Sequence, residues 1–556
     1  MKVALITTPP AVRSGIADYT RHLLPYLQQH CDVELYVQDG QAGDEVLGLP
    51  THELSSLTSR GCDQILYQLG NEAHHGFMAR AIKQLGGIVM QHDWVLFDMA
   101  CSAYPALTRG GVKGSLLAAR EGGRRQLQTY LGNLGRRRRL RVKPLQAPSD
   151  LPDRDGFLAG WYDAEGHGRW IADEAVLAVS GANIDQVRVL FNAPPGRTVV
   201  AEGEGGANAT ARTTPEQAWG ELRLEFGGAD RARIKLHVDN VKVTREQRAH
   251  GDPRRLAAFV ERIVVVEGGV ERDLPLEDAP VTPIPAIHLA SDRFQLPLNH
   301  SITRGADGFI VHSEYVANHI RSIRGKHVPI GLVHHGAERR WNDEPQADVR
   351  ARLGLSGEWL DAFMLTSFGG VQAHKRVDKV LAAVALARQS RPGLRLAMVG
   401  ALCSESFDAQ VEAERLGLTE AVHFAGFVSE EDAWAWLHAG DLAINLRGPT
   451  SGGTSGGIFQ AFAQGRPVIA SNAGEQRELP DSCTLKVPLG EGEVEGIAAE
   501  LVRLHDDRVA LGRLQKAARD FVDSECHWSH CAAKYAEYLA KFPRPRVASS
   551  RTRAAL

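Results

Sequence analysis

Short apolar segments alternate with longer amphipathic segments in two separate parts of this chain, and no other feature of the sequence constrains the fold more. In the first part, residues 3–6 are apolar, and Tyr19, Leu23, Leu24 and Leu27 then recur at helical spacing after a turn rich in Pro, Ser and Gly. The second part begins near Phe363. Strands that alternate with helices form a parallel sheet that helices cover on both faces. We therefore expect two doubly wound, Rossmann-like α/β domains.

The expected strands are short and apolar. In the first part they are residues 3–6, 33–37, 65–69, 87–90, 308–311 and 330–333, and in the second part residues 364–368, 396–399, 422–424, 442–446 and 467–470.

Between the two pieces of the first part, from about Pro148 to Leu274, the hydrophobic period changes to two. Apolar and polar residues alternate over 222–226 and 234–238, and residues 175–179 and 187–191 are further strand candidates. Several short strands punctuated by Gly and Pro predict an antiparallel sandwich. Because the α/β pattern returns after this block, we interpret it as an all-β sandwich inserted into the first α/β domain.

These patterns divide the 556 residues into six segments. They are the first α/β domain in two pieces (1–147 and 281–345), the inserted sandwich (148–280), the second α/β domain (346–520), a C-terminal helix (521–542) and a basic tail (543–556).

The composition is that of an ordinary globular protein, with 43% hydrophobic and 24% charged residues. The 64 Lys and Arg nearly balance the 67 Asp and Glu, which argues against a nucleic-acid partner. The apolar run at the N-terminus is too short for a signal peptide, and the seven scattered cysteines fit reduced thiols. We expect a cytoplasmic protein.

Two segments are locally basic: Arg136 to Arg139, before the insert, and the tail. The favoured interpretation is a solvated helix face and a frayed terminus. The alternative is peripheral attachment to an anionic membrane or to a lipid-linked acceptor.

A glycine-rich window, residues 447–463, follows the strand expected at 442–446 and opens an apolar helix. Glycines let the backbone approach a ligand closely, and Thr454 and Ser455 can cap the helix. The N-terminus of a helix, the positive end of its dipole, binds anions, and the diphosphate of a sugar nucleotide is the ligand that we expect there. The alternative is an ordinary flexible loop.

Other segments of interest also lie at the carboxyl ends of the expected parallel strands, where ligands bind in such sheets. Lys375 and Arg376 follow the first strand of the second domain and can reach phosphates, unless they are merely solvent-exposed. Gly15 follows the first strand of the chain, and His92 and Asp93 end the strand expected at 87–90.

Taken together, these segments resemble glycosyltransferase family four, whose retaining enzymes have the two-domain GT-B fold. The resemblance is carried by residues 9–19, 67–71, 92–93, 311–315, 335–336, 375–376, 449–457 and 465–471. It implies a nucleotide-sugar donor on the second domain, a saccharide or lipid-linked saccharide acceptor on the first, and no metal or other cofactor. The implied role is hexosyl transfer in surface polysaccharide or glycoconjugate synthesis.

The resemblance also assigns roles to single residues. It implies that Lys375 binds the diphosphate and that His92 and Asp93 lie near the transferred sugar. The remaining implied donor contacts are Gly15, Gly370, Arg376, Thr454, Ser455, Gly456 and Gly457. Transfer in this family is thought to be a front-face displacement in which the leaving phosphate helps to deprotonate the acceptor, so the protein acts by positioning and by stabilising charge.

This chain departs from the family pattern at four positions. Gly452 and Gln460 replace the two glutamates of the donor helix, Gly453 replaces the single glutamate of a related subgroup, and Gly370 replaces an arginine. Since a site that loses polar contacts loses rate, the alternative function is a catalytically inactive homologue that binds carbohydrate or acts as a scaffold. The donor base, sugar, acceptor and linkage are not readable from these motifs.

The insert resembles galactose-binding-like jelly-roll modules at residues 160–170. Trp161, Tyr162 and Trp170 can stack on a sugar ring, although large aromatic residues are more often buried packing.

Two clusters of possible ligands are not expected to bind metal. Residues 526–531 pack Cys and His too closely for one tetrahedral ion, and they begin a helix that in the family crosses back to the first domain. His74 and His75 belong to the loop that follows Asn71.

Overall fold

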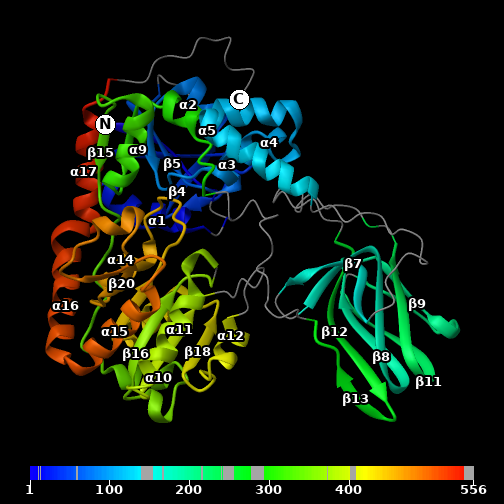
Figure 1. Cartoon of the computed structure of the whole chain (residues 1–556). Coiled ribbons are helices and arrows are strands. Elements are labelled where there is room, and N and C mark those ends of the chain that lie inside the picture. Colours follow the sequence, from blue (N-terminus) through cyan, green and yellow to red (C-terminus); the bar gives the residue numbers. More distant parts are fainter. Residues whose placement is uncertain are drawn as a thin grey trace. The chain divides into compact units, whose positions relative to one another are not determined.

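The structure is a computed structural model that describes residues 1–9, 12, 14–57, 61–139, 155–165, 168–214, 217–239, 241, 256–276, 294–371, 373–400 and 409–543. The chain forms two compact units (Figure 1). The first, Met1–Thr129 with Arg293–Cys403 and Ala409–Leu556, holds both α/β domains, and the second, mainly Tyr130–Asp292, is built of β-strands. The side chains of Arg136 to Arg139 and tail residues 544–556 lie outside the described residues.

The N-terminal α/β domain contains an eight-stranded sheet in the order β15-β14-β6-β5-β1-β2-β4-β3. All neighbouring pairs are parallel except β3 with β4. The strands are β1 (Lys2–Ile6), β2 (Asp32–Val37), β3 (Glu45–Val46), β4 (Leu49–Glu53), β5 (Gln64–Leu69), β6 (Ile88–Gln91), β14 (Gly308–Val311) and β15 (Ile330–Leu332). Since β14 pairs with β6, the chain rejoins this sheet after the inserted unit.

Helices follow these strands in turn. They are α1 (Gly15–Leu27), η1 (Leu54–Ser56), η2 (Ala73–His75), α2 (Gly76–Leu85), α3 (Phe97–Ala103), α4 (Ala106–Arg109), α5 (Gly111–Arg139), α8 (His300–Gly305) and α9 (Glu314–Arg324). Ser14 caps α1 by accepting hydrogen bonds from the amides of Ile16 and Ala17. Tyr19, Leu23, Leu24 and Leu27 are buried, as their spacing predicts.

The C-terminal α/β domain contains a six-stranded, wholly parallel sheet in the order β18-β17-β16-β19-β20-β21. Numbered along the domain, this is the 3-2-1-4-5-6 order of a Rossmann fold. The strands are β16 (Phe363–Phe368), β17 (Leu394–Val399), β18 (Val422–Gly426), β19 (Leu442–Asn445), β20 (Val468–Ser471) and β21 (Thr484–Val487). Two doubly wound α/β domains are therefore confirmed.

The helical elements of this domain alternate with its strands. They are α10 (Gln346–Arg352), η5 (Gly357–Trp359), η6 (Ala373–Lys375), α11 (Val377–Arg388), α12 (Ala409–Arg415), α13 (Glu430–Ala439), α14 (Gly456–Ala463), η7 (Gly474–Glu478), α15 (Glu493–Asp506) and α16 (Arg508–Phe521).

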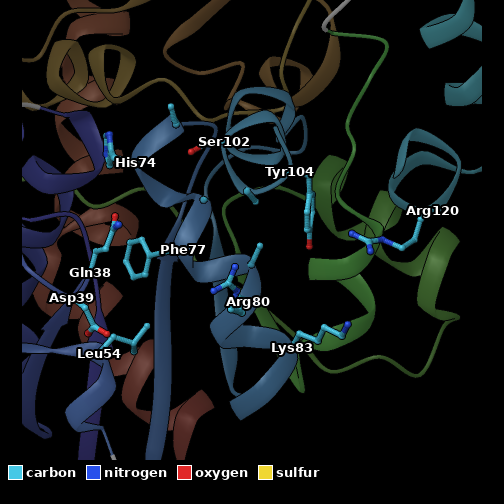
Figure 2. Close-up of a pocket in the computed structure, with 14 residues that line it drawn as sticks. Gln38, Asp39, Leu54, His74, Phe77, Arg80, Lys83, Ser102, Tyr104 and Arg120 are labelled. Carbon is cyan, nitrogen blue, oxygen red and sulfur yellow. The ribbon is translucent and has the colours of Figure 1, made fainter. Parts of the chain in front are cut away.

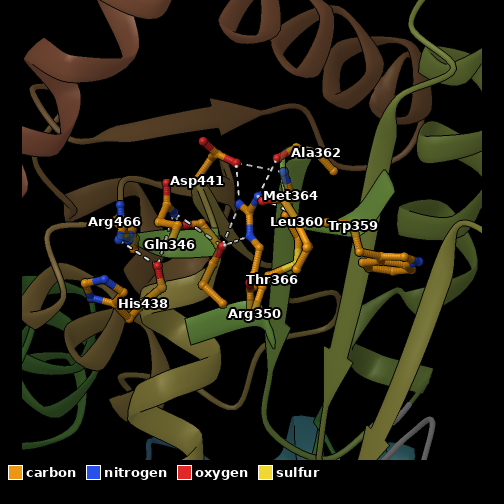
Figure 3. A network of polar contacts seen from close by, with 12 residues as sticks. Gln346, Arg350, Trp359, Leu360, Ala362, Met364, Thr366, His438, Asp441 and Arg466 are labelled. Carbon is orange, nitrogen blue, oxygen red and sulfur yellow. Dashed lines mark hydrogen bonds and ion pairs between the residues drawn. The ribbon is translucent and has the colours of Figure 1, made fainter. Parts of the chain in front are cut away.

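A buried arginine holds α10 to the amino-terminal ends of the central strands β16 and β19 (Figure 3). The guanidinium of Arg350 donates to the carbonyls of Ala362 and Ala439, at 2.8 Å and 2.7 Å, and pairs with Asp441 at 3.2 Å. Asp441 in turn accepts from the amide of Met364 in β16 at 2.8 Å. Because its hydrogen-bonding groups have partners, this charge can be buried.

The last helices return to the N-terminal domain. After η8 (Val522–Cys526), α17 (Trp528–Ala540) packs Trp528, Tyr535 and Leu539 into the N-terminal core. The hydroxyl groups of Tyr535 and Tyr19 lie 2.9 Å apart. Burial raises the pKa of the Cys526 and Cys531 thiols, so both are apolar packing groups and not thiolates.

The β-rich unit differs from the sandwich of short antiparallel strands that the sequence predicts. The four predicted segments are parts of two long strands, β8 (Gly168–Asn192) and β11 (Trp219–Val238), which pair across a bulge. Furthermore, β12 (Ala258–Glu267) runs parallel to β8. The other strands are β7 (Gly156–Glu165), β9 (Thr198–Gly203), β10 (Asn208–Arg212) and β13 (Val270–Asp273), all in one seven-stranded sheet.

No helix within the described residues combines the length and the apolar character needed to span a bilayer.

Candidate functional site

The topological switch point of the C-terminal sheet lies between β16 and β19, where the strand order reverses. In open α/β sheets, ligands bind beyond the carboxyl ends of the strands at this point. The loop to η6 leaves β16 here, and the glycine-rich loop to α14 leaves β19. The two sequence motifs that predict a donor site therefore lie side by side.

The N-terminus of α14 is open to a ligand. Ser455 holds the N-cap position, but its side chain makes no capping hydrogen bond. The prediction that Thr454 and Ser455 cap this helix is therefore wrong for Ser455. A Cβ on Gly457 would lie 3.2 Å from the Phe368 ring, so the helix begins directly against the end of β16. Free amides and the positive end of the helix dipole together favour an anion.

Lys375 lies at the same end of β16. Its Nζ is 2.6 Å from the position that a Cβ on Gly369 would take. Gly369 has φ = 103°, a conformation that favours glycine, and a Cβ on the neighbouring Gly400 would overlap the Gly369 carbonyl. Gly370 follows in this tightly packed turn, with its amide 2.9 Å from the Cβ position of Gly400. The predicted phosphate lysine is thus placed over glycine backbone at the switch point.

Arg376 is differently engaged. Its guanidinium forms a two-pronged ion pair with Glu493, which is fully buried at the start of α15. This contact raises the pKa of Arg376. The arginine therefore anchors α15 to the loop after β16 and is held away from the role in phosphate binding that the sequence suggests.

Arg447 is a cation at this site that sequence reasoning missed. It lies two residues after the end of β19, and its Nη1 is 2.8 Å from His374 Nε2. Its buried Nε has no hydrogen-bond partner in the described part of the chain, and burial lowers the pKa of this guanidinium. The signal in the sequence was its place, because ligands bind beyond the carboxyl ends of the strands at the switch point and Arg447 lies two residues after β19.

On the N-terminal domain, His92 and Asp93 follow β6. His92 Nε2 lies 2.7 Å from Gln68 Oε1, and its Nδ1 lies 3.4 Å from His312 Nε2. Asp93 accepts from the Asn71 amide and from the Ser451 hydroxyl, each at 3.0 Å. With both ring nitrogens facing protein groups, His92 is placed to position its neighbours, whereas the Asp93 carboxylate lies at the junction of the two domains.

Three histidines surround Tyr19 near the carboxyl ends of the strands of the N-terminal sheet. The rings of His92, His312 and His335 lie 4.7, 5.4 and 5.0 Å from the Tyr19 ring. Burial lowers the pKa of His92 and His312 well below the ordinary value and lowers the pKa of His335 to about 4. The cluster is therefore uncharged at neutral pH.

The glycine-rich loop contacts the N-terminal domain directly. The carbonyl of Ser451 accepts from the Val95 amide at 2.8 Å. On the other side, the Glu478 carboxylate accepts from the first amides of α9, at Glu314 (2.6 Å) and Tyr315 (2.5 Å). A helix N-terminus favours such a carboxylate. These contacts close the two domains over the switch point.

This closure explains two departures from the family pattern. A Cβ on Gly453 would overlap Asp93 Oδ1, and a Cβ on Gly452 would come within 2.7 Å of Trp94 Cβ. A glutamate at either position would collide with the loop that follows β6. Gln460 is half-buried on α14. The packing of the opposite domain against the loop therefore explains the glycines at 452 and 453, and nothing in the structure explains Gln460.

Gly15 is the first residue of α1 and is exposed, with no atom within 4 Å of the position that a Cβ would take. The close approach that the sequence suggests for this glycine is therefore not made by any protein group described here.

The aromatic residues of the β-rich unit serve mainly as packing. Trp161 packs against the core of its sheet and donates from Nε1 to the Val176 carbonyl at 2.9 Å. Tyr162 is only 8% exposed, and Trp170 lies 5.2 Å from the Phe259 ring. These contacts favour the packing interpretation over an open sugar-stacking face.

Glu72, His74 and His75 are close enough to share an ion, with ligand atoms within 4.8 Å of one another. However, both ring nitrogens of His75 already face protein groups, namely the Thr8 hydroxyl at 2.8 Å and the Gly70 backbone at 3.2 Å. His75 thereby links the loops after β1 and β5, as a structural residue does.

Comparison with known proteins bears on the C-terminal domain. Residues 362–507 match the family described as glycosyl transferases group 1. The chain is 26% identical over 255 residues to glycogen synthase of Mycobacterium tuberculosis (strain CDC 1551 / Oshkosh), covering 44% of this chain and 58% of that protein. It is 29% identical over 254 residues to D-inositol 3-phosphate glycosyltransferase of Streptomyces avermitilis, covering 42% and 49%. The chain thus spans about half the length of the curated relatives it matches.

Among solved structures, WaaG, a glycosyltransferase involved in lipopolysaccharide biosynthesis, aligns over 97% of this chain and 100% of its own with a TM-score of 0.46 and 11% identity. The matched segment of the sequence begins just before β16 and ends with α15, so it contains both loops of the switch point. The similarity to the glycosyl transferases group 1 family thus lies in the C-terminal α/β domain.

Proposed function

We propose that this protein is a retaining glycosyltransferase that moves a hexose from a nucleotide sugar to a saccharide or lipid-linked saccharide, in surface polysaccharide or glycoconjugate synthesis. The observation that carries this proposal is the pairing of an uncapped α14 N-terminus with Lys375 at the end of β16, inside the segment that matches the family. The curated relatives transfer sugars according to their names, which supports the same reaction class.

The site supplies positioning and charge stabilisation. The α14 amides and the Lys375 ammonium are donors aimed at the diphosphate, where negative charge grows as the glycosidic bond breaks. Arg447 adds a cation whose Nε is unsatisfied in the described residues. The contact of Ser451 with Asp93 holds the N-terminal domain, which would carry the acceptor, against the donor loop.

The neutral histidine cluster fits this chemistry. Burial keeps His92, His312 and His335 uncharged, so the positive charge offered to the diphosphate comes from Lys375 and Arg447. His92 then acts through its contact with Gln68 as a positioning residue, and the departing phosphate oxygen is the base for the acceptor hydroxyl.

The test is nucleotide binding by the purified full chain, measured by calorimetry and thermal shift with UDP, GDP and ADP sugars. Lys375→Ala is expected to weaken binding of the preferred nucleotide about 10-fold or more, since it removes a charge-assisted contact. His92→Ala is expected chiefly to lower transfer. Lys379→Ala, at a half-buried lysine of α11 that pairs with Asp378, is the matched control.

Equal effects of Lys375→Ala and His92→Ala on binding would contradict these roles, and failure of every nucleotide sugar to bind would overturn the enzyme proposal. A second function, a catalytically inactive carbohydrate-binding or scaffold subunit, is favoured by the glycines at 452 and 453, whose side of the site has no room for the family glutamates. That function predicts nucleotide or saccharide binding without turnover.

A further inference from the structure

The N-terminal α/β domain has a pocket of about 540 Å³ apart from the donor loops (Figure 2). It is walled by the residues after β2, the start of η1, the exposed face of α2, the end of α3 and Arg120 of α5. The volume is within the range of small-molecule sites and suits a sugar-sized guest.

Cations dominate the charge of this pocket. Arg80 and Lys83 lie three residues apart on the exposed face of α2, and Arg120 faces them from α5. Neither Arg80 nor Lys83 makes an ion pair within the part of the chain that the structure describes. Arg120 pairs with Glu121 at 2.7 Å and lies 4.6 Å from the centre of the Tyr104 ring. Asp39 is the acidic residue of the lining.

Two like charges three residues apart on a helix destabilise it slightly, and these exposed side chains contribute no core packing in return. An anionic ligand would offset the repulsion between Arg80 and Lys83 and would accept hydrogen bonds from both side chains. Arginine in particular matches the planar, two-oxygen edge of a phosphate or carboxylate.

The rest of the lining suits a polyhydroxylated molecule. Phe77 and Tyr104 offer flat aromatic surface, and Gln38 and Ser102 offer hydrogen-bonding groups. Figure 2 shows Phe77 and Gln38 on one side of the pocket and Tyr104 with Arg120 on the other. Aromatic surface with a few directed polar groups is the usual composition of a small-molecule site.

The pocket connects to the candidate active site through one loop. His74 lines the pocket and pairs with Glu72 at 2.6 Å. In the same loop, the Asn71 amide donates to Asp93, the residue at the junction of the two domains. The pocket and the candidate active site thus share the loop of residues 71–75 on the N-terminal domain.

Building on the transferase function above, we propose that this pocket binds the acceptor, and that the acceptor is a saccharide or polyol carrying a phosphate or carboxylate held by Arg80, Lys83 and Arg120. Phe77 and Tyr104 orient the sugar ring, and the side of the pocket lined by His74 faces the loop that carries Asn71.

The test uses the full chain without donor, titrated by calorimetry with glucose 6-phosphate, glucuronate and neutral glucose. One or both anionic sugars should bind on the order of 10-fold more tightly than glucose, and the preference should shrink as salt screens the charges. The two anionic probes separate a phosphate site from a carboxylate site. Arg80→Gln and Lys83→Gln should each lose most of that preference.

Nucleotide binding, measured on the same variants, should be unchanged, and Lys113→Gln, an exposed lysine of α5 outside the pocket lining, should behave as wild type. Equal binding of charged and neutral sugars, no binding of any of the three, or wild-type binding by both glutamine variants would overturn the pocket proposal. If nucleotide sugars fail to bind while anionic sugars do, the transferase function falls and the acceptor role of the pocket falls with it.

Discussion

Replacing Gly453 with alanine tests how the two α/β domains close. The added methyl group would overlap Asp93 Oδ1 and come within 3.0 Å of Asp93 Cγ, so the loop or the carboxylate has to move. That movement breaks the Ser451 to Asp93 hydrogen bond of 3.0 Å. A hydrogen bond to a charged group contributes about 2 kcal/mol, and overpacking by one methyl costs about 1 kcal/mol. We expect a loss of about 3 kcal/mol.

Thermal and denaturant unfolding of the full chain measure this loss, which corresponds to a fall in Tm of roughly 6 to 12 °C. Asp93→Ala provides the second arm of a double-mutant cycle, because it removes the group that the methyl would strike. In that background Gly453→Ala should cost less than about 0.5 kcal/mol. Gly456→Ala is the matched control, since its Cβ would make an ordinary 3.4 Å contact with His335 Nε2.

Equal costs for Gly453→Ala in the wild-type and Asp93→Ala backgrounds would refute the overlap as the cause. The same geometry predicts that Gly453→Glu, which restores the carboxylate of the related subgroup, destabilises the protein further and does not raise transfer, because it places a second carboxylate against one whose pKa burial already raises.

Two further predictions concern stability. Arg350→Ala should cost about 2 to 3 kcal/mol in denaturant unfolding, because it removes the charged donor of the Ala362 and Ala439 carbonyls and one of the two arginine partners of Asp441, Arg508 being the other. The exposed Arg352→Ala should change stability by about 0.5 kcal/mol or less, and similar losses for both would contradict the network. The pKa of His335 is about 4 in the folded protein, against 6.5 for an ordinary histidine. The contribution of the neutral ring to the free energy of unfolding is therefore fully present above pH 6.5, and up to about 3 kcal/mol of it is lost as the pH falls toward 4. His335→Asn should flatten this part of the stability profile and His30→Asn, at an exposed position, should not; an unchanged slope in His335→Asn would reject the assignment.

The β-rich unit shows where sequence patterns stop being sufficient. The sequence predicts separate strands at 222–226 and 234–238, but Gly227 and Gly228 adopt positive φ, 61° and 88°, within one continuous strand. The partner strand β8 bends at Asn183, which also has positive φ, and the two strands stay paired across the bulge. Glycines of a turn and glycines of a bulge look alike locally, and only the partner strand distinguishes them.

The sequence by itself determined the two α/β domains, because burial of a parallel strand and amphipathicity of a covering helix are written in the period of neighbouring residues. For β16 the expected start differs from the observed one by a single residue. It also located the loops of the candidate donor site, since loop positions follow from strand ends.

Only the tertiary structure decided what the side chains in those loops contact. Arg376 joins Glu493, 117 positions away, and Ser451 joins Asp93, 358 positions away. The positive pocket likewise brings Arg80 and Lys83 of α2 together with Arg120 of α5. Such pairings depend on how whole elements pack against each other, and no local pattern encodes that packing, because the free energy of each contact is realised only after both elements are in place.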